Sequence, residues 1–133
     1  MCDEDKDCVE VQQNAAVANR AQMSEAEGSQ VVRVTVDPGI CGFCGSIRAS
    51  KKGKRSVELQ IETECKNVRR LASSLQEITL QQLFLPLSRN PIFIAAEKGK
   101  CHASCPYPAA LVKAAEVALA VALPKKVNIC FEK

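Results

Sequence analysis

The sequence predicts an α+β fold: a small antiparallel sheet of three or four strands with two or three helices on one face. Three observations support this prediction. Residues 31–63 carry short β-branched runs separated by turn residues. Residues 65–78 change to the apolar spacing of an amphipathic helix, and residues 109–123 are apolar on nearly all sides, as in a buried helix. Strands followed by helices are typical of a sandwich with one layer of each.

Three segments are expected to form the first three strands. Residues 31–36 are rich in β-branched side chains and end at an Asp-Pro-Gly turn, and residues 46–50 follow a Cys-Gly-Phe-Cys-Gly loop. Residues 56–63 alternate clearly between apolar and polar, with Val57, Leu59 and Ile61 on the apolar face. That face is expected to pack against the two long helices.

Helical spacing begins after the third strand. The apolar residues at i, i+3, i+4 and i+7 predict a helix that begins near Cys65; they are Val68, Leu71, Ala72, Leu75 and Ile78. Thr79 and Gln82 have the spacing of a capping box, which predicts a short helix that ends before Pro86. Residues 88–100 are expected to be loop, with a short strand over 92–94 as an alternative.

The last helix is expected over 109–123, with Ser104 or Cys105 at its N-cap and Pro106 in the first turn. Pro124 is expected to end it, and residues 127–131 alternate as a terminal strand does. Residues 1–30 supply little periodic apolar surface, so we expect a flexible or peripheral N-terminal tail, of which residues 1–28 are dispensable for folding. Residues 31–133 then form a single domain.

Composition excludes several classes of protein. No apolar run in the 133 residues reaches the roughly 18–20 residues of a membrane span. A net charge of +3 and 4% aromatic residues do not indicate nucleic-acid binding. The first thirty residues lack the apolar region of a secretory signal. We therefore expect a cytoplasmic protein whose partners include neither membrane nor nucleic acid.

Eight cysteines are the unusual feature of the chain. Structural disulfides are rare in a reducing compartment, so clustered cysteines there indicate metal ligands or redox thiols. Cys41 and Cys44 form a C-x-x-C motif followed by Gly45, and this spacing suits two ligands of one metal ion. A redox C-x-x-C is typically followed by a helix. Because a strand is expected here, the metal interpretation is favoured.

Cys101, His102 and Cys105 directly precede the last predicted helix. The N-terminus of a helix stabilises thiolates and lowers their pKa, and a neutral imidazole can bind metal. The sequence leaves open which of these three side chains are ligands. Cys65 lies between the third strand and the first helix, where burial as a small apolar residue is the alternative.

The candidate ligands are expected to lie together at one end of the sheet. The reason is that the 51–55 turn returns the third strand beside the loop from which the second strand starts, while the last helix packs on the same sheet. The predicted metal ligands are Cys41, Cys44, Cys65, Cys101, His102 and Cys105. Cys2 and Cys8 are expected to be incidental thiols, and Cys130 a core or edge-strand residue.

This order of features resembles the iron–sulfur cluster scaffold proteins of the IscU/NifU type. The resemblance covers about residues 31–122 and implies that three cysteines and a nearby histidine hold a cluster or zinc on an α+β sandwich. It assigns Cys41 to the first scaffold cysteine, Cys65 to the second, and Cys105 or Cys101, with His102, to the third. Phe43 stands where the scaffold family has an aspartate.

The segment before the last helix carries two further resemblances. Ala103-Ser104-Cys105-Pro106 resembles the Thr-Ser-Cys-Pro-Asp motif of a small cysteine-rich domain. The C-x-x-x-C-P-x-P segment that begins at Cys101 is also similar to one in short uncharacterised prokaryotic proteins.

The expected function is the binding of zinc or an iron–sulfur cluster by four or five thiolates, since both accept four sulfur ligands. Such a protein would act as a cluster scaffold or carrier, with cluster donor or acceptor proteins as partners, rather than as an enzyme. One alternative is a metal-free thiol redox or sulfur-transfer protein that uses Cys101 and Cys105. Another is an interaction domain whose cysteines are core residues.

Overall fold

The computed structural model describes residues 31–132, so the predictions for residues 1–30, including Cys2 and Cys8, lie outside the described residues. The elements in chain order are β1 (Val31–Val36), β2 (Gly45–Lys52), β3 (Ser56–Thr63), α2 (Lys66–Ser74), β4 (Glu77–Thr79), α3 (Leu80–Leu83), the 3₁₀ helix η1 (Leu87–Arg89), α4 (Pro91–Lys98) and α5 (Tyr107–Ala118).

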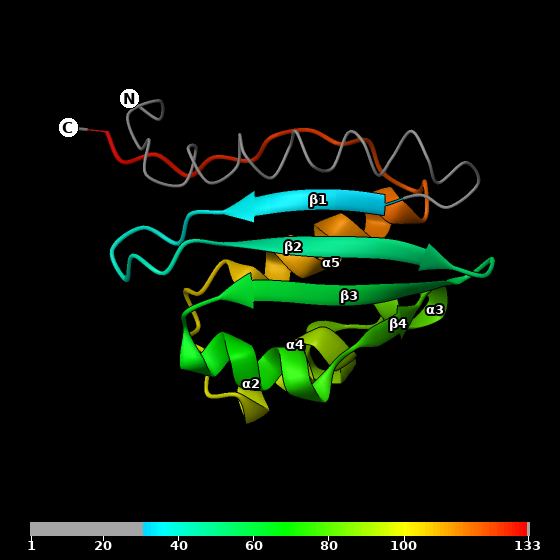
Figure 1. Cartoon of the computed structure of the whole chain (residues 1–133), viewed down its shortest axis with the longest axis horizontal. Coiled ribbons are helices and arrows are strands. Elements are labelled where there is room, and N and C mark those ends of the chain that lie inside the picture. Colours follow the sequence, from blue (N-terminus) through cyan, green and yellow to red (C-terminus); the bar gives the residue numbers. More distant parts are fainter. Residues whose placement is uncertain (1–30, 133) are drawn as a thin grey trace.

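The four strands form one antiparallel sheet in the order β1-β2-β3-β4 (Figure 1). In the register of β2 and β3, Gly45 lies opposite Thr63. The loop between β1 and β2 therefore lies beside the end of β3. The α+β prediction is confirmed, as are the strands over 31–36 and 56–63; β2 is slightly longer than expected.

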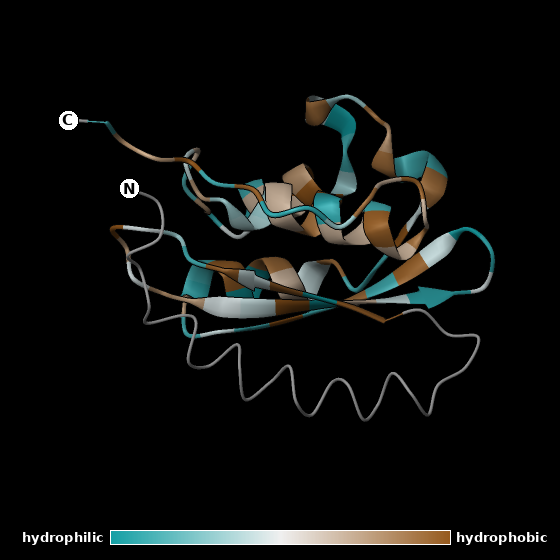
Figure 2. Cartoon of the chain, turned by 90° about the horizontal axis from the view of Figure 1, so that it is seen from above, coloured by the Kyte–Doolittle hydropathy of each residue, from teal (hydrophilic) through white to brown (hydrophobic). Residues whose placement is uncertain are grey.

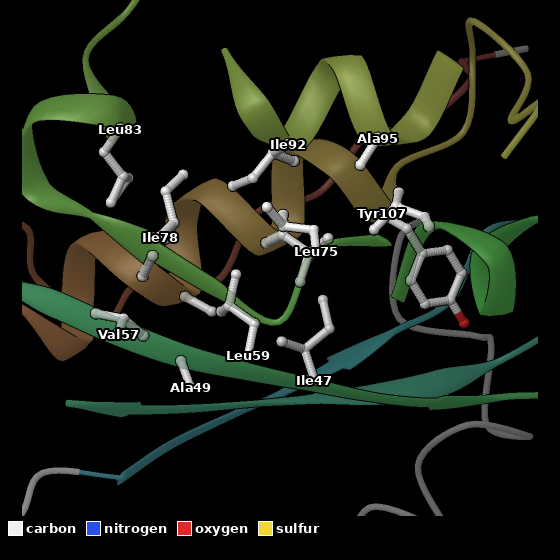
Figure 3. Packing of buried hydrophobic residues seen from close by; sticks show 14 of the residues in the cluster. Ile47, Ala49, Val57, Leu59, Leu75, Ile78, Leu83, Ile92, Ala95 and Tyr107 are labelled. Atoms are coloured by element: carbon white, nitrogen blue, oxygen red, sulfur yellow. The ribbon is translucent and has the colours of Figure 1, made fainter. Parts of the chain in front are cut away.

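The helices lie on one face of the sheet (Figure 2). Helix α5 packs on β1 and β2, α2 packs on β3, and α4 packs on both helices. Val57 and Leu59 are buried and Ile61 packs at the margin of the core, as predicted. Aliphatic side chains from both layers fill the space between them, and the Tyr107 ring lies at one end of this core (Figure 3).

The predicted helix over 65–78 is wrong after Ser74. Helix α2 ends at Ser74, and Leu75 has extended backbone angles (φ −136°, ψ 103°). The chain then forms β4, in which Ile78 pairs with Val57 and is fully buried. The helical spacing of Leu75 and Ile78 misled the prediction, since a short strand over the same core buries the same side chains.

The predicted loop over 88–100, with its alternative strand over 92–94, is also wrong. These residues form η1 and α4. Asn90 caps α4 by accepting a hydrogen bond from the Ile92 N–H (3.0 Å), and Pro91 occupies the first turn. Asparagine at the N-cap followed by proline is a favourable helix start.

The end of the chain differs from the prediction as well. Helix α5 begins at Tyr107, with Pro106 as an N-cap that makes no side-chain hydrogen bond, and ends at Ala118. Ala120 takes a left-handed conformation (φ 62°), which turns the chain before Pro124. Residues 127–131 form no strand within the described chain, and Val127, Ile129 and Phe131 are exposed. An alternating pattern alone does not make a strand, because a strand needs a hydrogen-bonded partner.

Across residues 31–132, none of the helices combines the length and the hydropathy that a bilayer span requires.

Candidate metal centre

Three cysteine-bearing segments meet at one end of the sheet: the loop 37–44, the junction between β3 and α2, and the segment 99–106 (Figure 1). The pairing of Gly45 with Thr63 joins the first two segments. The third segment reaches this end because α5 packs along β1 and β2. Strand pairing and helix packing together therefore bring together residues that are distant in the sequence.

The loop 37–44 is a series of tight turns. The Gly39 N–H donates to Asp37 Oδ1 (3.0 Å), the Gly42 N–H to the Gly39 carbonyl (3.0 Å), and the Cys44 N–H to the Gly42 carbonyl (3.0 Å). Gly39 and Gly42 have positive φ angles of 84° and 74°, which glycine adopts with little strain. These turns leave Cys41 exposed at the tip of the loop.

Tyr107 joins the three segments. Its hydroxyl donates a hydrogen bond to the Phe43 carbonyl (2.6 Å) and lies 3.2 Å from Thr63 Oγ1. Thr63 Oγ1 in turn accepts a hydrogen bond from the Cys65 N–H (3.2 Å). The tyrosine is only 1% exposed, so these contacts lie at the edge of the core.

Cys101 and Cys105 lie in the turn before α5. The Cys101 N–H donates to the Ala96 carbonyl and the Cys105 N–H to the His102 carbonyl, both at 3.0 Å. The two thiols are half-buried and hydrogen-bonded to each other, whereas the His102 side chain is exposed.

Neighbouring thiols lie close enough to Cys101 and Cys105 to affect the ionisation of these two side chains. Burial, followed by the charges of Cys105 and Cys65, raises the pKa of Cys101 to about 11. Burial also raises the pKa of Cys105, with Cys65 and Cys41 adding to the effect, and it outweighs the backbone hydrogen bond from Tyr107 that lowers it. The expectation that the helix N-terminus lowers these pKa values is therefore wrong, because burial dominates.

Four of the predicted ligand residues are free thiols in this cluster: Cys41, Cys65, Cys101 and Cys105. Cys44 and Cys130 each take part in a disulfide bond, so Cys44 is not a free thiol in this form of the chain. Cys130 is exposed and lies in no strand.

Sequence reasoning missed Tyr107 and Thr63. The available signal was a single tyrosine at the start of a buried helix, two residues after a candidate ligand.

The four free thiols lie at the same end of the sheet, but their side chains do not have the arrangement of metal ligands. Within the described part of the chain, no three His, Cys, Asp or Glu side chains form a group that could hold a metal ion as they stand. Coordination at sulfur–metal distances of about 2.3 Å therefore requires the thiol side chains to change their arrangement.

The chain belongs to DUF6951, a family of unknown function whose model matches residues 32–131. Neither the curated proteins nor the solved structures contain a match to the chain.

Proposed function

We propose that this protein binds a metal centre, zinc or an iron–sulfur cluster, through the thiolates of Cys41, Cys65, Cys101 and Cys105. The observation that supports the proposal is the meeting of these free thiols, from three distant segments, at one end of the sheet. Thiolates are the ligands that both centres accept in fours. His102, exposed beside Cys101, is an alternative fourth ligand.

The electrostatics of the cluster favour a cation. Burial raises the pKa of Cys101 and of Cys105, because it disfavours the charged form, and the charges of neighbouring thiolates add to this effect. A bound metal ion offsets both effects, because its positive charge compensates the thiolates. Metal binding is therefore coupled to the release of protons from Cys101 and Cys105 at neutral pH.

An iron–sulfur cluster at this end would make the protein a cluster scaffold or carrier. Its partners would then be proteins that donate or accept clusters. The resemblance to IscU/NifU scaffolds favours this version, since Cys41, Cys65 and the 101–105 segment occupy corresponding places in the chain order.

One observation favours the alternative of thiol redox or sulfur transfer, namely the hydrogen bond between Cys101 and Cys105. Such chemistry uses a thiolate with a lowered pKa. The raised pKa of both thiols opposes it and leaves metal binding as the better-supported function.

The test is anaerobic purification followed by metal analysis, acid-labile sulfide analysis and visible spectroscopy. Iron with sulfide and visible colour identifies a cluster, whereas one zinc in colourless protein identifies a zinc site. Single Cys-to-Ser variants of the four thiols should lose the metal. Ser104→Ala, in the same turn but without a sulfur, should retain it. Full-length protein that is isolated without metal and binds neither zinc nor iron with sulfide contradicts the proposal.

A further inference from the structure

The Tyr107 hydroxyl contacts two residues that each stand two positions from a candidate ligand, and Tyr107 stands two positions from a third. Phe43 follows Cys41 by two residues, Thr63 precedes Cys65 by two, and Tyr107 itself follows Cys105 by two. The Phe43 carbonyl and Thr63 Oγ1 lie 2.6 and 3.2 Å from the tyrosine oxygen. One side chain therefore connects all three cysteine-bearing segments.

We propose that Tyr107 is a positioning residue of the metal centre, whose hydroxyl fixes the distances among Cys41, Cys65 and Cys105. This inference rests on the proposed function. The tyrosine does not touch the metal in this proposal; it acts through the backbone of the loop and through Thr63.

The burial of the tyrosine ring fixes the position of its hydroxyl relative to the core. The ring is buried at the first residue of α5 and held by the core (Figure 3), so the oxygen cannot move far relative to Cys105. Its hydrogen bond to the Phe43 carbonyl attaches the loop 37–44, which carries the exposed Cys41, to this oxygen. Thr63 extends the connection to the Cys65 N–H at 3.2 Å.

Gly45 provides the space for this arrangement. A Cβ atom at Gly45 would lie 2.5 Å from the tyrosine oxygen and would also collide with the Glu62 carbonyl. A residue without a side chain at the start of β2 is thus what allows the hydroxyl to reach the Phe43 carbonyl.

The experiment uses the full chain and Zn²⁺ as the probe, with affinity measured by competition against a chromogenic chelator. Tyr107→Phe keeps the buried ring and removes only the oxygen. We expect its zinc affinity to fall about 10–100-fold, the range for groups that orient metal ligands. Thr79→Ala is the control, because it removes the hydroxyl that caps α3 at the opposite end of β3. It should bind zinc as the wild type does.

A second measurement does not depend on metal. A short bifunctional thiol reagent should cross-link Cys41 to Cys105 in metal-free wild type and in Thr79→Ala, and much less in Tyr107→Phe, as read by peptide mass spectrometry. A merely structural role would lower stability without changing this yield. Equal cross-linking in Tyr107→Phe overturns the positioning role, as does equal zinc affinity. Wild type that cross-links as expected but binds no metal contradicts the proposed function instead.

Discussion

Gly45 lies where β3 and the Tyr107 hydroxyl both approach the backbone of β2 too closely for a side chain. A Cβ atom added here would collide with the Glu62 carbonyl, the Thr63 side chain and the Tyr107 hydroxyl. Any side chain here would push β2 away from β3, push the tyrosine away from the loop, or do both.

We predict that Gly45→Ala lowers the free energy of unfolding by about 1–3 kcal/mol, the usual effect of overpacking a tight site. Urea unfolding followed by circular dichroism measures it. In a Tyr107→Phe background the additional loss should be smaller, because the substitution removes one of the atoms that the new methyl group meets. Strict additivity of the two changes would mean that the hydroxyl contact is unimportant.

The raised pKa of Cys101 predicts how stability depends on pH. The unfolded chain loses this proton near pH 9.0, whereas the folded chain keeps it to about pH 11. Between these values the folded state binds more protons, so the free energy of unfolding should fall as the pH rises from about 9 to about 11.

The measurement is urea unfolding with chelator present at several pH values across this window. Cys101→Ser removes the titrating group and should show a shallower decline, and thiolate absorbance near 240 nm should report the corresponding titration. A stability that stays level or rises across the window would contradict the prediction.

Among individual residues, the sequence identified the candidate site through residue type and placement. Cys41, Cys65, Cys101 and Cys105 could be grouped because hairpin connectivity fixes where strand ends lie. The disulfide state of Cys44 and the raised thiol pKa values could not be foreseen, because both depend on which atoms the fold places nearby. Tyr107 was missed for the same reason, since its partners are 64 and 44 residues away.

At the scale of elements, sequence pattern succeeded where one local signal dominated. Residues 56–63 alternate strictly, and the capping box at Thr79 and Gln82 forms as predicted (3.3 and 3.0 Å). Sequence pattern failed in short segments such as α4. This helix has only eight residues, and its Ile92-Phe93-Ile94 run has the composition of a strand. In such a segment the N-cap decides, and the Asn90-Pro91 start was the stronger signal.

Asn90 gives a test of that conclusion. Its side chain is buried; Oδ1 accepts from the Ile92 N–H, and Nδ2 donates to the Leu83 carbonyl (3.1 Å). It therefore ties α4 to the end of α3. We predict that Asn90→Ala lowers the free energy of unfolding by about 2 kcal/mol, because a buried carbonyl and a helix N–H lose their partners.

Thr79→Ala is the comparison for Asn90, because it removes an exposed cap and should lower stability by about 1 kcal/mol. Both values come from urea unfolding under the same conditions. An effect of Asn90→Ala no larger than that of Thr79→Ala would show that burial adds nothing to this cap.

At the scale of the whole molecule, the hydrophobic core and the thiol cluster are separate. The buried residues that form the core include no cysteine, and Cys65, Cys101 and Cys105 only pack against its margin. The sheet and helices therefore have their own source of stability. We therefore expect this protein to stay folded without metal, unlike small zinc domains, which unfold when the metal is removed.

We predict that a chelator leaves the circular dichroism spectrum of the protein unchanged, and that added zinc raises the free energy of unfolding by mass action. At a free zinc concentration of about 100 times Kd the gain should be about 2.7 kcal/mol, because only the folded chain holds the four thiols together. Thermal unfolding at a series of zinc concentrations measures it.

The control is the variant in which Cys41, Cys65, Cys101 and Cys105 are all replaced by serine. It should unfold near the temperature of the metal-free wild type and should not respond to zinc, because its core is intact and its ligands are gone. Loss of secondary structure in chelator would show instead that metal organises the fold. Equal stabilisation of the variant by zinc would place the metal elsewhere on the chain. Under the proposed function, a core that includes no thiol and a thiol cluster at its margin would let the metal be bound and released by a folded protein, as a carrier requires.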